Sequence, residues 1–111
     1  MQEIHSFQKV STMVDVDETI KRLQTQKDVV GVVIMDTKGR VIRSTLDDET
    51  TTQTSTLLHQ LCDKSAWVVK EMDPTNDLTF LRLRTKKNEI MVAPNKDYLM
   101  AVLTQLNSSS K

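Results

Sequence analysis

The sequence has few of the residues from which catalytic and ligand-binding sites are usually built. Gly31 and Gly39 are the only glycines among 111 residues, so no glycine-rich loop is present to hold a phosphate. The only candidate nitrogen or sulfur ligands for a metal are His5, His59 and Cys62. His59 and Cys62 stand three residues apart, but no third ligand accompanies them. We therefore expect no metal site and no cofactor.

Activated nucleophiles are missing as well. No serine or cysteine stands in a context that would lower its pKa or supply a general base. The paired acids Asp47 and Asp48 lie in a polar connection, which is typical of solvation or of charge at a helix N-terminus. We interpret Cys62 as a small residue at the margin of the core, and we expect a protein that is not an enzyme.

An excess of charge of either sign is also absent. The chain has 15 basic and 15 acidic side chains, whereas a nucleic-acid-binding protein usually carries a clear positive excess. One local cluster stands out, with Arg82, Arg84, Lys86 and Lys87 close together. A basic patch for nucleic acid or membrane is one interpretation of this cluster. Two strands and a turn kept soluble by their charges are the other, and we expect no nucleic-acid partner.

Long apolar runs are missing too. The runs at residues 29–35 and 98–103 are far shorter than the roughly 20 residues of a membrane-spanning helix. The N-terminal residues have no continuous apolar core, so we expect no secretory signal. A single cysteine fits a reducing environment. We expect a cytoplasmic domain that does not insert into membranes.

The periodic segments that remain predict one domain at residues 15–106, between a flexible arm at 1–14 (a short helix is the alternative) and a fraying tail at 107–111. Asp15 is the expected N-cap of the first helix. The second helix carries one broad apolar stripe, in which the predicted buried residues are Thr54, Leu57, Leu58, Leu61, Ser65, Val68, Val69 and Met72. The expected helices cover about residues 15–27 and 50–72, and the expected strands cover 29–35, 40–45, 78–85, 89–94 and 98–105.

The strand faces predict the order of the sheet. Residues 29–35 and 98–103 are apolar at both alternating sets of positions, which is typical of central strands covered by helices on both faces. Polar residues interrupt 40–45 and 78–85, which we therefore place at the edges. With hairpin pairing, these assignments predict an α+β sandwich with a five-stranded antiparallel sheet in the order 2-1-5-4-3 and helices on both faces.

The exposed third strand suggests self-association. A long edge strand must be blunted or paired, and this one carries Phe80 without a proline. A twofold dimer through the edge would make one continuous sheet, and a covered or solvated edge is the alternative. Trp67 lies about 120° around the second helix from its apolar stripe, at 100° per residue. An interface position and packing against a loop or the arm are equally good interpretations of Trp67.

Three segments resemble the Roadblock-type light chains of dynein. The segment "NDLTFLRLRTKKNEIMVAPNKDY" at 76–98 is similar to the family's signature almost position by position. Residues 18–47 and 60–80 resemble the first helix with its hairpin and the long helix with the following loop. The likeness covers about residues 17 to 105.

This resemblance implies a homodimer built by pairing third strands and packing second helices side by side. We expect Leu57, Trp67, Phe80 and Arg82 at that interface. The resemblance also implies a non-catalytic light chain that binds the dynein intermediate chain, in the cytoplasm on microtubules or in a ciliary or flagellar axoneme. The alternative is a scaffold or regulator of a small GTPase, as in broader relatives of the fold.

Three departures from the family leave parts of this expectation open. The arm is longer than usual, residues 51–60 are richer in threonine, and Trp67 replaces a small residue. Two of the departures lie on the helix expected at the interface, so a heterodimer with a paralogue is an alternative to the homodimer.

Overall fold

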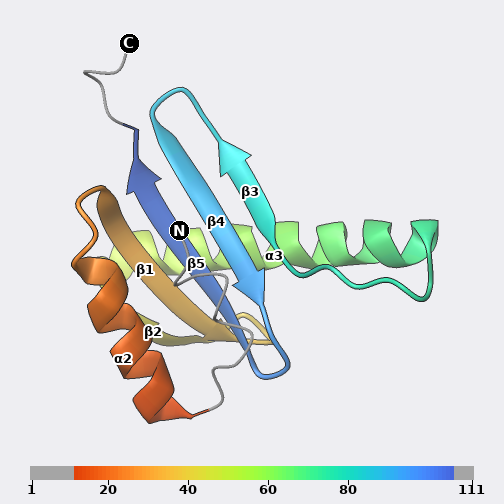
Figure 1. Ribbon diagram of the computed structural model, residues 1–111, viewed down its shortest axis with the longest axis horizontal. Coiled ribbons are helices and arrows are strands. Elements are labelled where there is room, and N and C mark those ends of the chain that lie inside the picture. Colours follow the sequence, from red (N-terminus) through yellow and green to blue (C-terminus); the bar gives the residue numbers. More distant parts are fainter. Residues whose placement is uncertain (1–11, 107–111) are drawn as a thin grey trace.

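The computed structural model describes residues 12–106, which form two helices and one five-stranded sheet. Figure 1 shows the helices on opposite faces of the sheet. The expected arm lies outside the described residues except for its last positions, and the expected tail lies outside them entirely. The elements are α2 (Met13–Gln24), β1 (Val29–Asp36), β2 (Val41–Ser44), α3 (Asp48–Met72), β3 (Leu81–Arg84), β4 (Asn88–Pro94) and β5 (Tyr98–Gln105).

The predicted strand order is confirmed. The sheet runs β2-β1-β5-β4-β3, and every neighbouring pair is antiparallel. The two central strands, β1 and β5, are those with apolar residues on both faces, and the interrupted strands are at the edges. Within residues 12–106, no helix has the length and apolar character that crossing a bilayer requires.

Two core clusters cover the two faces of the sheet. The cluster under α2 lies between that helix and the sheet and consists of Val16, Ile20, Leu23, Val32, Ile34, Met91, Ala93, Met100 and Val102. The cluster under α3 lies between that helix and the sheet and consists of Val33, Met35, Leu58, Cys62, Val92, Leu99 and Ala101. The alternation of β1, β4 and β5 therefore distributes apolar side chains to both faces, as a central strand requires.

The start of β1 departs from the predicted alternation. We expected Val29 to share a face with Val33, but Val29 packs against the cluster under α2. Val30 is 49 % exposed, although we expected it to lie beside Val32. The pairing with β5 is irregular between Val29 and Gly31, and such an irregularity changes the face to which the preceding residues point.

The first helix begins earlier than predicted. Thr12, and not Asp15, is the N-cap, and its hydroxyl accepts a hydrogen bond of 3.1 Å from the backbone N–H of Asp15. The helix ends at Gln24, three residues before the expected end, where the Thr25 hydroxyl donates to the Arg22 carbonyl. Capping chemistry, which the apolar period does not reveal, sets both ends.

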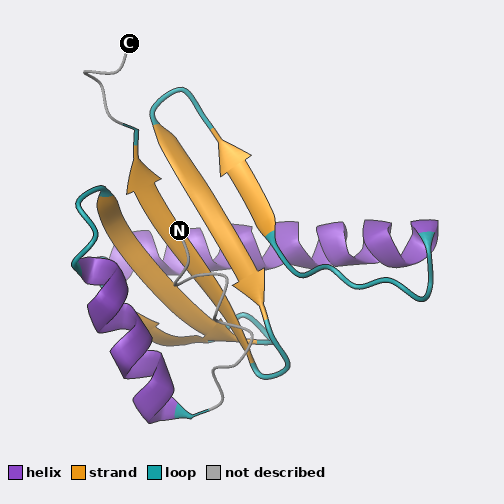
Figure 2. Cartoon of the chain, viewed as in Figure 1, coloured by secondary structure: helices purple, strands orange, loops and turns teal. Residues whose placement is uncertain are grey.

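The long helix α3 begins at Asp48, capped by Asp47. The Asp47 carboxylate accepts a 2.7 Å hydrogen bond from the Thr50 N–H, and this bond lowers the pKa of Asp47. Buried side chains occur only in the first 15 of its 25 residues, at Thr51, Ser55, Leu58 and Cys62. Figure 2 shows why: α3 crosses the sheet and projects beyond β3, and a loop then returns along it.

The turn between β1 and β2 fixes a glycine against α3. The Asp36 carboxylate accepts hydrogen bonds of 2.9 Å from the backbone N–H groups of Arg40 and Lys38. It also forms an ion pair of 2.7 Å with the Arg40 guanidinium. The hydrogen bond from the Arg40 backbone contributes most to lowering the pKa of Asp36. Gly39 takes a φ of 89°, and an added Cβ would lie 2.9 Å from the ring of His59.

Replacing Gly39 with alanine should destabilise the fold. A Cβ there would be strained by the positive φ and would collide with His59, and together these effects should cost about 1–3 kcal/mol in the free energy of unfolding. Denaturant unfolding followed by circular dichroism would measure the change. Lys38→Ala in the same turn is the control, and an equal loss in both variants would contradict the steric explanation.

Candidate functional site

The most prominent surface is the sheet edge formed by β3. Among the described residues, β3 pairs with β4 alone, so the backbone groups on its outer side have no neighbouring strand. The strand is shorter than expected and covers Leu81–Arg84 instead of residues 78–85. A short four-residue edge is still long enough to pair with another strand in an antiparallel manner.

The apolar side of this edge lies on the α3 face. Leu81 and Leu83 alternate with the arginines of β3, and Leu83 is opposite Ile90 of β4. Leu81 and Ile90 pack only partly against the cluster under α3, and all three side chains remain half-buried. The face of the sheet next to its free edge is therefore only partly covered.

An apolar stripe on α3 continues this surface. Leu57, Leu61, Val68 and Met72 recur at intervals of four and seven residues, which places them on one flank of a helix. Leu61 packs partly against the same cluster as Leu81 and Ile90. Leu57 is 58 %, Val68 40 % and Met72 82 % exposed. The prediction that these three are buried is wrong within a single chain, because the described residues cover them only in part.

Trp67 lies on a different face of α3. At about 100° per residue, it stands roughly 80° around the helix from Leu57 and 100° from Val68. It is 54 % exposed, and the Lys64 ammonium lies 4.3 Å from the ring centroid. A cation–π contact of this kind covers part of the ring. A place for Trp67 in an interface stays a prediction, and Leu57 is the better placed of the two.

The two other predicted interface residues also point away from the α3 flank. Phe80 precedes β3 and packs partly against the cluster under α2, although we expected it within the strand. Arg82 lies on that same face, opposite Met91, and its Nε is 3.1 Å from the Glu89 carboxylate. Both residues adjoin the free edge, but neither belongs to the apolar surface beside it.

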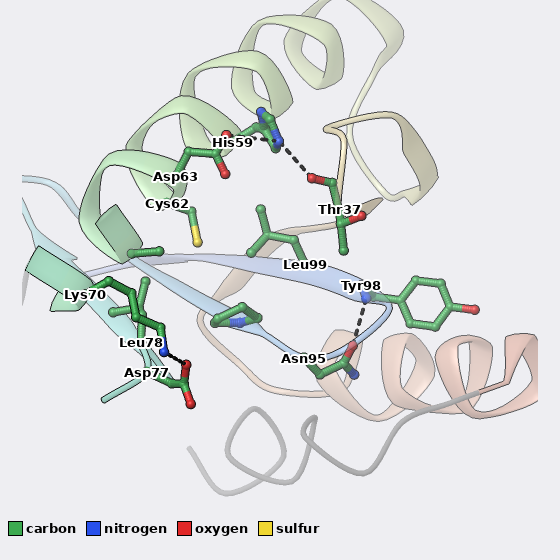
Figure 3. Close-up of a pocket in the computed structure, with 12 residues that line it drawn as sticks. Thr37, His59, Cys62, Asp63, Lys70, Asp77, Leu78, Asn95, Tyr98 and Leu99 are labelled. Atoms are coloured by element: carbon green, nitrogen blue, oxygen red, sulfur yellow. Dashed lines mark hydrogen bonds and ion pairs between the residues drawn. The ribbon is translucent and has the colours of Figure 1, made fainter. Parts of the chain in front are cut away.

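A cleft of about 210 Å³ lies on the other flank of α3. Figure 3 shows His59, Cys62, Asp63 and Lys70 of α3 facing the turns that carry Thr37 and Asn95. The Lys70 ammonium is 2.8 Å from the carboxylate of Asp77 at one side of the mouth. Small-molecule sites usually measure about 300–1,000 Å³, so this cleft suits a side chain better than a cofactor.

The sequence did not predict the role of His59. Its side chain is only 22 % exposed. Its Nε2 lies 3.1 Å from the Thr37 carbonyl and 3.7 Å from the Asp63 carboxylate. The nearby Gly39 is the sequence signal that a large side chain packs against this turn. Among residues 12–106, no cluster of three metal-binding side chains is present.

Comparison with known proteins identifies a family for this chain and solved structures that share its fold. The family model of the Roadblock/LC7 domain matches residues 15–104 of the chain. A Roadblock/LC7 domain from Streptomyces avermitilis shares the fold with a TM-score of 0.71 at 15% identity, over 78% of this chain and 73% of the other. MglB from Myxococcus xanthus gives 0.65 at 15% identity, over 76% and 70%. The gliding protein MglB from Thermus thermophilus gives 0.66 at 11% identity, over 81% and 70%.

The thiol of Cys62 should be unreactive in the folded protein. The side chain is buried, and this burial raises the pKa of the thiol, with the nearby Asp63 carboxylate as a smaller cause. A raised pKa means less thiolate at any given pH, and the thiolate is the nucleophile. Iodoacetamide should therefore alkylate Cys62 much more slowly in the native than in the urea-unfolded chain, as mass spectrometry would show. Equal rates would contradict the packing described for this cleft.

Proposed function

The chain belongs to the Roadblock/LC7 domain family, and from this we propose that it is a non-catalytic, homodimeric module that binds another protein. The observation that carries the proposal is the apolar surface formed by the half-buried leucines of β3 and the stripe of α3, since Leu81 and Leu61 pack partly against the same cluster. A contiguous apolar surface next to an open sheet edge is typical of an association site.

A dimer with its twofold axis at the β3 edge would cover both parts of this surface. Antiparallel pairing of β3 with its copy extends the sheet to ten strands and provides partners for the outer backbone groups. The same rotation carries the second α3 onto the same face of the sheet. Leu57, Leu61 and Val68 then meet the other protomer's Leu81 and Leu83, and apolar burial contributes about 25 cal/mol per Å².

For the partner, a small GTPase is the candidate that the comparisons favour. The three solved structures compared above are bacterial: one is a Roadblock/LC7 domain and two are MglB proteins. One MglB structure has a tetrameric arrangement, so association between copies occurs in this fold. The resemblance read from the sequence extends to broader relatives that act as scaffolds for small GTPases, and a scaffold or regulator of that class fits a surface without catalytic groups.

The dynein intermediate chain is the second candidate, and a specific observation favours it. Residues 76–98 resemble the signature of the dynein light chains almost position by position, and they include β3, the following hairpin and β4. A light chain of this type would grip a segment of intermediate chain by apolar burial and backbone pairing. Both candidates require the same dimer.

Leu57→Lys should convert the dimer to a monomer. The side chain is more than half exposed, so the change leaves the core intact while it places a charge in the proposed helix contact. Sedimentation velocity should show a lower sedimentation coefficient, with unchanged circular dichroism. Thr56→Lys puts the same charge on the preceding, exposed position, and this variant should remain dimeric. A dimeric Leu57→Lys variant would remove α3 from the interface.

Affinity purification from native tissue separates the two partner classes. The tagged wild-type chain should recover one partner class, and the Leu57→Lys variant should recover markedly less of it, because both candidates are proposed to bind the dimer. A small GTPase among the recovered proteins supports the first candidate, and a dynein intermediate chain supports the second. Undiminished recovery by a monomeric variant would contradict the dependence of binding on the dimer.

A further inference from the structure

The basic side chains of β3 form a cluster that the dimer contact does not use. Arg82 and Arg84 lie on the α2 face of the sheet, opposite Met91 and Glu89 of β4. The Glu89 side chain is only 11 % exposed. It lies 3.1 Å from the Nε of Arg82 and 3.3 Å from an Nη of Arg84. One largely buried carboxylate thus serves two arginines that are 54 % and 66 % exposed.

Twofold symmetry places two such clusters on one face of the joined sheet, whatever the register of the pairing. A twofold axis perpendicular to the sheet preserves its faces, and residues directly opposite each other in an antiparallel pair point to the same face. Arg82 and Arg84 of one protomer must therefore lie on the same face as those of its partner. With an axis near the middle of β3, the arginines become direct or diagonal neighbours, with Cβ atoms about 4.5–8 Å apart.

The seam then carries an excess of positive charge. Arg82, Arg84 and Glu89 together add one net positive charge per protomer, so these three side chains contribute two in the dimer. Like charges directly opposite each other destabilise a strand pair. An anionic group bound across the axis would offset this repulsion, and neither protomer alone holds more than half of the site.

We propose that the seam, on its α2 face, binds an acidic segment of a partner protein through Arg82 and Arg84 of both protomers. The inference rests on the proposed dimer and adds to it the chemistry of the partner. Guanidinium groups pair with carboxylates through two parallel hydrogen bonds, which suits the side chains of aspartate and glutamate.

Two observations favour an acidic protein segment over a nucleic acid. The chain as a whole carries no net charge, so no long-range field attracts a polyanion. The four residues of β3 extend over only about 13 Å, which is too short for a track of many phosphates. An adjoining hollow of about 270 Å³ is lined by Asp28 as well as by Arg82 and Glu89, so the acidic segment follows the seam and not this hollow.

The test measures binding of a short fluorescein-labelled oligoglutamate peptide to the full chain, by fluorescence anisotropy at low ionic strength. Arg84→Gln removes two charges from the seam of a dimer and should weaken binding by about tenfold, the usual effect of losing a charge-assisted hydrogen bond. Lys87→Gln removes the same charge from the β3–β4 turn and should change affinity much less. Leu57→Lys should lose the binding together with the dimer.

Sedimentation of each variant keeps the outcomes distinct. A monomeric wild-type chain would overturn the proposed function and this inference together. A wild-type dimer that does not bind the peptide would overturn the inference alone. Equal affinity in Arg84→Gln and wild type, or equal losses in Arg84→Gln and Lys87→Gln, would overturn it too, as would tighter binding of an oligonucleotide of the same charge.

Discussion

The mismatch between the length of α3 and the width of the sheet is the constraint from which the proposed association follows. Five strands spaced about 4.8 Å apart span roughly 19 Å, whereas a helix of 25 residues is about 37 Å long. A helix that crosses such a sheet must project beyond it, as α3 does past β3 (Figure 1). Its first 15 residues bury Leu58 and Cys62, and its last ten leave Val68 and Met72 exposed. This overhang accounts for the exposed apolar residues near the end of the helix.

Most of the fold was predictable because the apolar pattern of the strands is unambiguous. Strands with two apolar faces are expected to be central and interrupted strands at the edges, and with hairpin pairing these assignments gave the sheet order. The predictions that were wrong concern local geometry. The irregularity at Val29 changes which face that residue occupies, and no periodicity reveals it. Thr12 is the cap in place of Asp15, and because both are good capping residues the sequence alone does not decide between them.

The candidate site was predictable only in part. The apolar stripe of the second helix was visible in the sequence, but periodicity cannot tell burial under a sheet from burial under a second copy. Leu57 and Val68 were therefore expected in the core and are found at the surface. The edge arginines were visible as a basic cluster, yet their shared contact with Glu89 depends on the register of β3 with β4. His59 was missed because its partner, the turn at Gly39, is distant along the chain.

Amide hydrogen exchange along β3 tests the central claim most directly. In the monomer, every second backbone N–H of Leu81–Arg84 points to solvent and should exchange rapidly. Pairing of β3 with its copy would place those N–H groups in a continuous antiparallel ladder. Exchange measured by NMR should therefore slow at these positions as the protein concentration rises through the dimerisation range. A dimer in which the outer amides of β3 still exchange at their unprotected rates would contradict the account.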